Sequence, residues 1–109
     1  MATKKLPKKV IREVSQYLNI LKEDKLSIDE IYVFGSFAKG KQRRGSDIDV
    51  CVVSPKFRNF FKSNQYLWGK LPEDPYLLIE PVGFTPQDFE VVSSPLVYEI
   101  KKHGIKVEV

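Results

Sequence analysis

Two aspartates separated by one residue, Asp47 and Asp49, are the side chains of this sequence best suited to chemistry. They stand at the start of an apolar segment, 48–53, that is typical of a β-strand. Because side chains alternate along a strand, both carboxylates are expected on one face. Two carboxylates held side by side repel each other, and a divalent cation removes that conflict. Mg²⁺ is usually held by one or two carboxylates together with substrate phosphates, so the pair predicts a metal site.

A Gly-Ser turn upstream of the aspartates is suited to binding phosphate. Gly35-Ser36 follows a β-branched and aromatic segment, 28–34, and precedes residues 37–39, which are expected to begin a short helix ended by Gly40. Such a turn exposes backbone N–H groups, and glycine lets the backbone approach a phosphate closely. The Ser36 hydroxyl can donate to a phosphate oxygen. The turn therefore predicts the phosphate half of a nucleotide site.

Basic residues fill the loop between the turn and the aspartates, and they are suited to neutralising a triphosphate: Lys39, Lys41, Arg43 and Arg44. Each feature alone has an ordinary structural explanation, as a plain turn, a solvated acidic pair or a charged surface loop. One ligand, a metal-bound nucleoside triphosphate, accounts for all three at once. Their combination therefore favours the functional interpretation.

The elements that must position these residues follow from periodicity and turn residues. Helices are expected at 8–22 and at 95–103, the second ended by Gly104, with a partly helical segment at 55–70 and a helix start at Thr85-Pro86. Strands are expected at 28–34, 48–53, 76–82 and 105–109, with Pro81 indicating an edge or a bulge, and a turn at 71–75. The pattern predicts one α+β or α/β domain over 1–109, with a loose leader at 1–7. Periodicity leaves the strand order open.

Composition narrows the class of protein. The 109 residues suit a single domain, and a net charge of +4 suits an anionic ligand without by itself indicating nucleic acid. No apolar run approaches the roughly 20 residues that span a bilayer, and no signal-type run follows the basic N-terminus, so a cytoplasmic location is expected. The single cysteine, Cys51, forms no internal disulfide, and with one histidine it makes no zinc site.

The stretch from Gly35-Ser36-Phe37-Ala38-Lys39-Gly40 to Ser46-Asp47-Ile48-Asp49-Val50 resembles the DNA polymerase β-like nucleotidyltransferase superfamily. The motif of that superfamily is Gly-Ser, ten residues, and Asp-x-Asp, and Phe37 to Ser46 supply the ten. The positions of Ala38, Gly40 and Ser46 look like the minimal nucleotidyltransferase branch, whose members are small single domains. The resemblance extends over nearly the whole chain and implies a small mixed sheet of three to four strands flanked by helices.

The resemblance also implies an activity, which is metal-dependent transfer of a nucleoside monophosphate from a triphosphate to a hydroxyl group. The preferred interpretation is transfer of AMP from ATP, with Mg²⁺ or Mn²⁺ as the metal ion. It implies a third carboxylate on a neighbouring strand, and Glu80 is the candidate, although the family usually has Asp there. The catalytic and metal-binding set is then Asp47, Asp49 and Glu80. The nucleotide-binding set is Gly35, Ser36, Lys39, Arg43, Arg44 and Ser46.

Members of this branch are often paired with a helical HEPN-type protein, and some act as antitoxins that adenylylate a tyrosine of that partner. An alternative is a binding module that keeps the fold and acts by covering its partner. This alternative stays open because Glu80 stands where the family usually has Asp. A nucleic-acid-binding role ranks lowest, since it is favoured only by net charge. The acceptor, the nucleotide preference and the oligomeric state, including a homo-oligomer, stay open.

Three other groups of residues have mainly structural interpretations. His103 beside Gly104 is expected to cap a helix end or face solvent, and Cys51 is expected to be a small buried apolar residue. Core packing is expected for most of the aromatic residues near position 60. Stacking on a base or binding a partner is the alternative for this mixed group: Phe60, Tyr66 and Trp68 with Lys56, Arg58 and Lys62.

Overall fold

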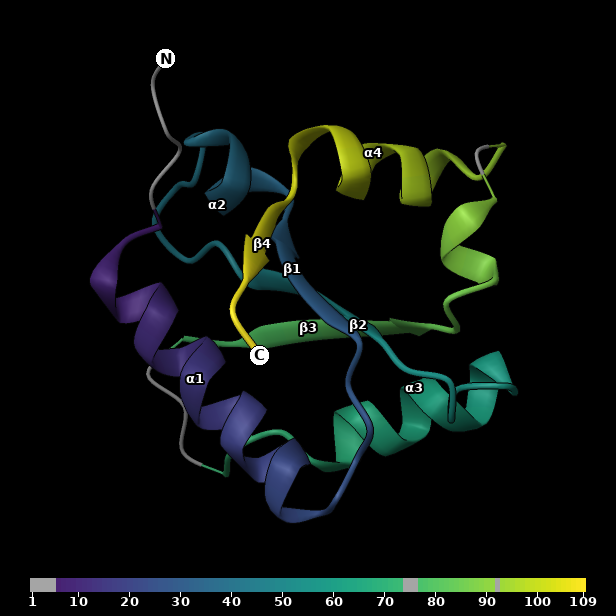
Figure 1. Ribbon diagram of the computed structural model, residues 1–109. Coiled ribbons are helices and arrows are strands. Elements are labelled where there is room, and N and C mark those ends of the chain that lie inside the picture. Colours follow the sequence, from purple (N-terminus) through teal and green to yellow (C-terminus); the bar gives the residue numbers. More distant parts are fainter. Residues whose placement is uncertain (1–5, 74–76, 92) are drawn as a thin grey trace.

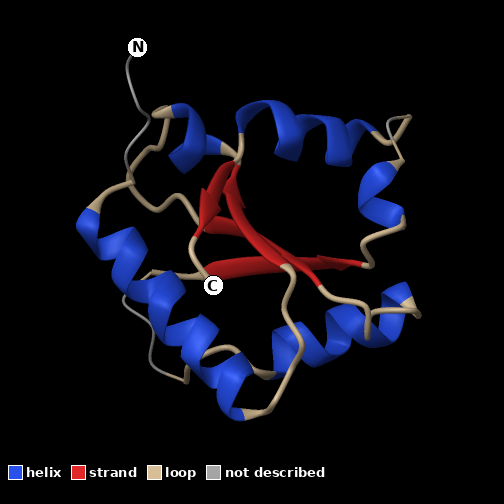
Figure 2. Cartoon of the chain, viewed as in Figure 1, coloured by secondary structure: helices blue, strands red, loops and turns tan. Residues whose placement is uncertain are grey.

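A four-stranded mixed sheet with helices on both faces forms the frame of the protein (Figures 1 and 2). The computed structural model describes residues 6–73, 77–91 and 93–109. Along the chain the elements are α1 (Lys8–Glu23), β1 (Glu30–Phe34), α2 (Ser36–Lys39), β2 (Ile48–Val53), α3 (Phe60–Gly69), β3 (Ile79–Phe84), the 3-10 helix η1 (Asp88–Glu90), α4 (Pro95–His103) and β4 (Ile105–Val107). The expected α+β class with a small mixed sheet is confirmed.

The strand order is β3-β2-β1-β4, which periodicity had left open. β1 runs antiparallel to both β2 and β4, whereas β2 and β3 are parallel. β3 is an edge strand, so Pro81, which has no N–H to donate, is accommodated as predicted. Among the described residues no helix is long and apolar enough to cross a membrane.

The two faces of β2 supply two separate cores because its side chains alternate. Val50 and Val52 join the core on the side of α1 and α3, together with Tyr17 of α1. Cys51 and Val53 face the other way and pack with residues of η1 and α4. Burial raises the pKa of the Cys51 thiol to about 12, as suits the buried apolar residue that was predicted. Asp49 shares this second face at the end of the strand.

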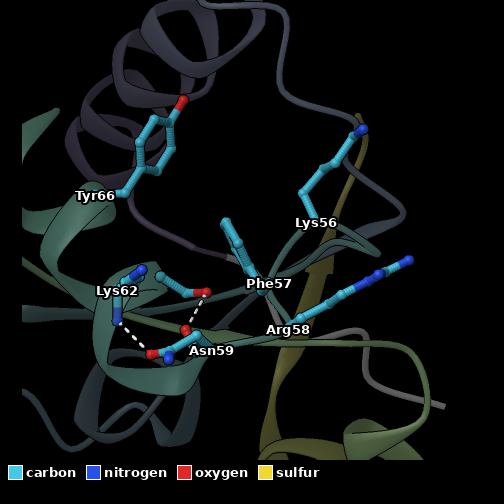
Figure 3. Close-up of a pocket in the computed structure, with 7 residues that line it drawn as sticks. Lys56, Phe57, Arg58, Asn59, Lys62 and Tyr66 are labelled. Carbon is cyan, nitrogen blue, oxygen red and sulfur yellow. Dashed lines mark hydrogen bonds between the residues drawn. The ribbon is translucent and has the colours of Figure 1, made fainter.

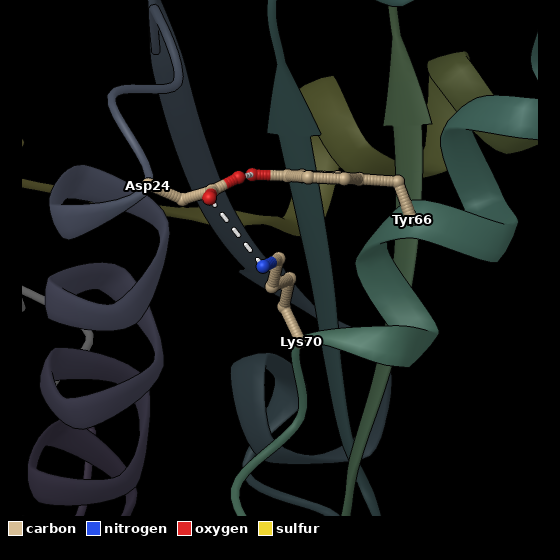
Figure 4. Close-up of polar contacts among 3 residues, drawn as sticks. All are labelled: Asp24, Tyr66 and Lys70. Atoms are coloured by element: carbon tan, nitrogen blue, oxygen red, sulfur yellow. Dashed lines mark hydrogen bonds and ion pairs between the residues drawn. The ribbon is translucent and has the colours of Figure 1, made fainter.

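A polar cluster joins the end of α1 to α3 (Figure 4). The Tyr66 hydroxyl donates to Asp24 Oδ2, and Lys70 Nζ lies 3.4 Å from Asp24 Oδ1. Deeper in the same interface, the buried Tyr17 hydroxyl donates to the Leu67 carbonyl at 2.7 Å. These contacts fix the position of α3 against α1.

The helix expected to start at Thr85-Pro86 is only the short 3-10 helix η1. The Thr85 hydroxyl accepts the Asp88 N–H at 3.0 Å, but Val91 is already extended (φ −76°, ψ 96°). Ser94 then has to be extended before Pro95 to cap α4, so no room is left for further helical turns.

Several predicted boundaries shift while the elements remain. β1 begins at Glu30 instead of residue 28, α1 extends to Glu23 and β4 ends at Val107. β3 spans Ile79–Phe84 instead of 76–82, because Gly83 continues the strand and leaves room for the Phe57 ring. Residues 1–5 of the expected leader and residues 74–76, which fall in the expected turn and strand start, lie outside the described residues.

Core packing was the wrong expectation for Phe60 and Trp68. Both side chains of α3 are exposed, as is Phe61, because α3 turns Ser63 and Leu67 toward the sheet instead. Tyr66 is half-buried and packs against the core, as expected.

Candidate active site

Strand register brings three carboxylates together at one end of the sheet. Asp49 lies in the central strand β2, opposite Phe34 of β1 on one side and Glu80 of β3 on the other. Asp47 is one residue before β2, and alternation places it on the same face as Asp49. We refer to Asp47, Asp49 and Glu80 as the carboxylate cluster. Asp47 and Asp49 are half-buried, and Glu80 is exposed on the edge strand.

Gly35 links the predicted phosphate turn directly to this cluster. It follows Phe34, the register partner of Asp49, and has φ 74° and ψ −149°, a conformation that favours glycine. A Cβ atom at Gly35 would collide with Asp49 Oδ2. The Gly-Ser turn and the aspartate pair are therefore parts of one site, in van der Waals contact, and glycine is required there for two independent reasons.

The single helical turn α2 holds the Gly-Ser backbone in place. The Lys39 N–H donates to the Gly35 carbonyl at 3.1 Å, and the Lys41 N–H donates to the Ser36 carbonyl at 2.9 Å. Gly40 ends the turn in the left-handed conformation, as predicted from its position. Because the first N–H groups of a helical turn have no partner within it, this arrangement leaves the N–H groups after Gly35 suited to donate to an anionic ligand.

Burial and mutual proximity raise the pKa of two members of the carboxylate cluster. The pKa of Asp49 is raised mainly by burial and further by the charge of Asp47, although a hydrogen bond with Glu80 opposes this. The pKa of Glu80 is raised first by a hydrogen bond to Asp47, then by burial and by the two neighbouring negative charges. The cluster therefore binds protons more readily than separate carboxylates do, and for the same reason it attracts cations.

The donor set fits a hard cation completed by substrate oxygens. Among the described residues, no group of three or more His, Cys, Asp or Glu side chains is arranged to hold a metal ion by itself. Mg²⁺ is usually bound through one or two carboxylates plus phosphates, so Asp47 and Asp49 with a triphosphate would complete such a set. After burial, the charge of Asp47 contributes to the raised pKa of Asp49, and a bound cation would relieve that repulsion.

The basic residues of the predicted nucleotide-binding set either pair with another side chain or line a separate hollow. Lys39 forms an ion pair with Glu99 of α4, each side chain being about one-third exposed. The Ser46 hydroxyl accepts the Arg43 N–H at 2.8 Å, which closes the loop before Asp47. Arg43, Arg44 and Ser46 line a hollow of about 460 Å³ beside the start of α1, and none of the three carboxylates is among its described lining residues. Their phosphate role stays a prediction.

Glu99 is the site neighbour that sequence reasoning missed. The Lys39 ammonium lowers the pKa of Glu99, which ties α4 to the turn that follows Gly35. Its position in the last helix carried no local signal, since the pairing depends on α4 packing against the end of β1.

Comparison with known sequences agrees with this geometry. The family model described as "Nucleotidyltransferase domain" matches residues 14–107. The chain therefore belongs to the nucleotidyltransferase domain family, and it falls in the minimal branch of the polymerase β-like superfamily. A curated relative from Methanocaldococcus jannaschii, "Putative protein adenylyltransferase MJ0128", is 32% identical over 97 residues, covering 83% of this chain and 98% of the relative. A second from that organism, MJ1215 of the same description, is 33% identical over 66 residues, covering 52% and 77%.

Solved structures share the fold. A crystal structure titled as a putative nucleotidyltransferase from Sulfolobus solfataricus superposes with a TM-score of 0.58 at 20% identity, covering 96% of this chain and 90% of that one. A toxin–antitoxin structure with AMP-PNP gives a TM-score of 0.56 at 22% identity, covering 84% and 69%. A mutant of the toxin–antitoxin MntA-HpeT gives 0.60 at 20% identity, with the same coverage. These structures share the fold, and the family model and the curated relatives support nucleotidyl transfer as the activity of this chain.

Proposed function

We propose that this protein transfers AMP from ATP to a hydroxyl group of a partner protein, with Mg²⁺ or Mn²⁺ as cofactor. The observation that carries the proposal is the contact between Gly35 and the Asp49 carboxylate, which joins a phosphate-binding turn to a cation-attracting cluster. A nucleoside triphosphate with its metal ion is the ligand that uses both halves. The curated relatives carry the description of protein adenylyltransferases, and this supports AMP and a protein acceptor.

Each part of the site has a role in that reaction. The acceptor oxygen attacks the α-phosphorus, the bond from that phosphorus to the bridging oxygen breaks, and pyrophosphate leaves. Backbone N–H groups after Gly35 and the Ser36 hydroxyl hold the phosphates, while Asp47 and Asp49 hold the cation. A metal ion held by Asp47 and Asp49 would supply charge stabilisation for the attacking and leaving oxygens. Glu80, whose pKa is raised, is the group suited to take the acceptor proton.

The partner that we propose is a HEPN-type helical protein, so that the chain acts as an antitoxin-like subunit in the cytoplasm. Support comes from the toxin–antitoxin complexes that share its fold. The structure with AMP-PNP, an ATP analogue, supports ATP as the nucleotide.

The experiment combines this chain with α-labelled ATP, Mg²⁺ and the protein encoded by the neighbouring gene, as the candidate partner. Wild type is compared with Asp47→Asn/Asp49→Asn, and Asp29→Asn, an exposed aspartate outside the cluster, is the matched control. Label on the partner from wild type and from the control, but not from the double variant, is the expected result. Label transfer by the double variant at the wild-type rate would show that the cluster is not the catalytic site.

A second function, protection of the partner by binding alone, has one observation in its favour. Glu80 lies exposed at the sheet edge, where the family resemblance implies Asp, and a poorly placed base would slow transfer. The same assay separates the two functions, because a binding module inhibits the partner equally with and without the aspartates and moves no label.

A further inference from the structure

The outer edge of β4 is bordered by an apolar groove. β4 is the last strand of the sheet, so one of its sides pairs with β1 and the other has no partner strand among the described residues. A groove of about 620 Å³ lies between this strand and α1, and Ile11, Ile105 and Val107 are among the residues that line it. In Figure 1, β4 lies between α1 and α4. An unpaired strand edge presents N–H and C=O groups to which another strand can bind.

Alternation divides the side chains of this edge between the two faces of the sheet. Val107 lies opposite Ile31, a member of the core on the side of α1, so Val107 and Ile105 face α1. Lys106, the residue between them, faces the side of α4, and continued alternation places Glu108 with it. The edge therefore has an apolar side, which adjoins the groove, and a charged side.

The sequence of this edge, Ile105-Lys106-Val107-Glu108-Val109, is complementary to itself. When two copies pair antiparallel about Val107, Lys106 of each copy lies opposite Glu108 of the other. In the same register Ile105 lies opposite Val109, on the side of α1. A centre one residue away would place Lys106 opposite Lys106, or Glu108 opposite Glu108, and like charges directly opposite are destabilising. Charge therefore selects one register for a pair of copies.

Both charged residues of the edge are accessible to a second copy. The ion pairs found among the described residues do not involve Glu108. Lys106 Nζ lies 3.3 Å from Glu30 Oε2 of β1, yet the Lys106 side chain is 60% exposed and can meet a second carboxylate. Pairing of two copies would then give alternating charges across the seam, from Glu30 to Lys106 to Glu108 of the other copy.

We infer that this edge pairs with the same edge of a second copy, which joins the two four-stranded sheets into one continuous sheet. The contact is isologous, because the same surface serves both copies about a two-fold axis. α1 of each copy then lies on the same face, beside the seam. There Ile11 and Val109, which are 49% and 48% exposed, gain apolar contacts. The strand that carries Glu80, β3, forms the opposite edge of the sheet and takes no part in the pairing.

The basic hollow at the start of α3 suits a second copy less well. Its volume is about 340 Å³, and the cations that line it are Lys56, Arg58 and Lys62 (Figure 3). A two-fold contact through this hollow would bring like charges together, which is costly. The edge of β4 has charges of both signs, in the order that a two-fold axis requires.

The test is analytical ultracentrifugation of the untagged chain at several concentrations, in which wild type is expected to form a concentration-dependent dimer. Lys106→Glu and Glu108→Lys each turn both symmetry-related attractive pairs into repulsive ones. Either change should therefore weaken dimerisation roughly 10- to 30-fold. In an equimolar mixture one chain is acidic at both positions and the other is basic at both. The mixture restores both pairs and should dimerise within about threefold of wild type.

Two further variants separate the groove from the rest of the surface. Ile11→Glu places a charge beside the seam and should weaken dimerisation about tenfold. Leu96→Glu, which alters a 39% exposed residue of α4, is the matched control and should stay within about twofold of wild type. Thermal unfolding checks that each variant is folded.

A wild-type chain that stays monomeric up to about 300 µM would overturn the inference. So would a dimer that neither charge reversal weakens, or folded variants that stay monomeric when they are mixed. Lys106→Glu also loses the contact with Glu30, so if that chain does not fold, Glu108→Lys is compared with Glu108→Gln, which should weaken dimerisation only about threefold. Asp47→Asn/Asp49→Asn should dimerise as wild type does, so failure of transfer and failure of dimerisation are distinguishable.

Discussion

The carboxylate cluster and the polar cluster of Asp24, Tyr66 and Lys70, which we call the Asp24 cluster, use the same chemical group in opposite ways. Asp24 accepts from Tyr66 and lies beside Lys70, and its pKa is lowered, first by the tyrosine hydrogen bond. Asp49 and Glu80 face other carboxylates, and their pKa values are raised. A group with a lowered pKa stabilises the folded state when ionised, whereas ionised groups with raised pKa values destabilise it. The comparison indicates that the Asp24 cluster stabilises the fold and that the carboxylate cluster is suited to a ligand.

The largest expected effect is on the transfer reaction itself. Asp49→Asn removes a carboxylate that touches Gly35 and keeps the side-chain volume, so label transfer should fall about 100-fold or more while the fold stays intact. Initial rates of label incorporation measure this. Asp24→Asn is the comparison from the other cluster, and a similar loss of transfer in that variant would contradict the division.

Gly35→Ala should have the next largest effect. It combines the strain of a positive φ with a collision against Asp49 Oδ2, and we expect transfer to fall on the order of 100-fold. Gly45→Ala is the matched control, because Gly45 has φ 85° and nothing near its missing Cβ, so it should cost only about 1 kcal/mol of stability. Equal activity of the two variants would mean that the contact of Gly35 with Asp49 has no functional role.

Glu80→Gln should change how stability depends on pH. The folded state keeps a proton on Glu80 at pH values where the unfolded state, with its ordinary pKa of about 4.5, has lost it. Unfolding then releases protons, so the free energy of unfolding falls as pH rises from about 4.5 through the raised pKa. In Glu80→Gln this decline should be smaller, as measured by urea unfolding at several pH values in the presence of a chelator. A decline as steep as in wild type would show that Glu80 is not coupled to the aspartates.

Tyr66→Phe should have the smallest effect, and it should lower stability without lowering the rate of transfer. It removes the donor to Asp24 while keeping the ring, so the melting temperature should fall modestly, and transfer should stay close to the wild-type rate. The loss should be largest above the ordinary pKa of Asp24 and should vanish as pH falls through its lowered value. If this substitution leaves the melting temperature unchanged at neutral pH, the Asp24 cluster does not stabilise the fold.

Local patterns predicted most of the fold and half of the site. Alternation placed Asp47 and Asp49 on one face, and β2 and α4 were predicted to the residue. The contact between Gly35 and Asp49 required the antiparallel register of β1 with β2, which is a long-range property without a local signature. Glu80 came from family resemblance, and its place opposite Asp49 depends on the parallel pairing of β2 and β3.

Residue type alone led to wrong expectations where the surroundings of a side chain depend on long-range packing. Phe60 and Trp68 have the apolar character of core residues, yet α3 buries Ser63 and Leu67. The side of a short helix that meets the sheet is set by the connections at its ends, here the Asn59 cap and the Asp24 cluster. Lys39 similarly had the position of a phosphate ligand, but its pairing with Glu99 depends on a helix sixty residues further along the chain.

The most direct test of the central claim is thermal unfolding of wild type and Asp47→Asn/Asp49→Asn, with and without Mg²⁺ and ATP. Without metal, the double variant should be the more stable chain, because its carboxylate repulsion has been removed. With Mg²⁺ and ATP at about a hundredfold excess over Kd, wild type should gain about 2.7 kcal/mol and the double variant little, so that the order reverses. A metal-free wild type that is more stable than the variant, or equal gains for the two chains, would contradict the account.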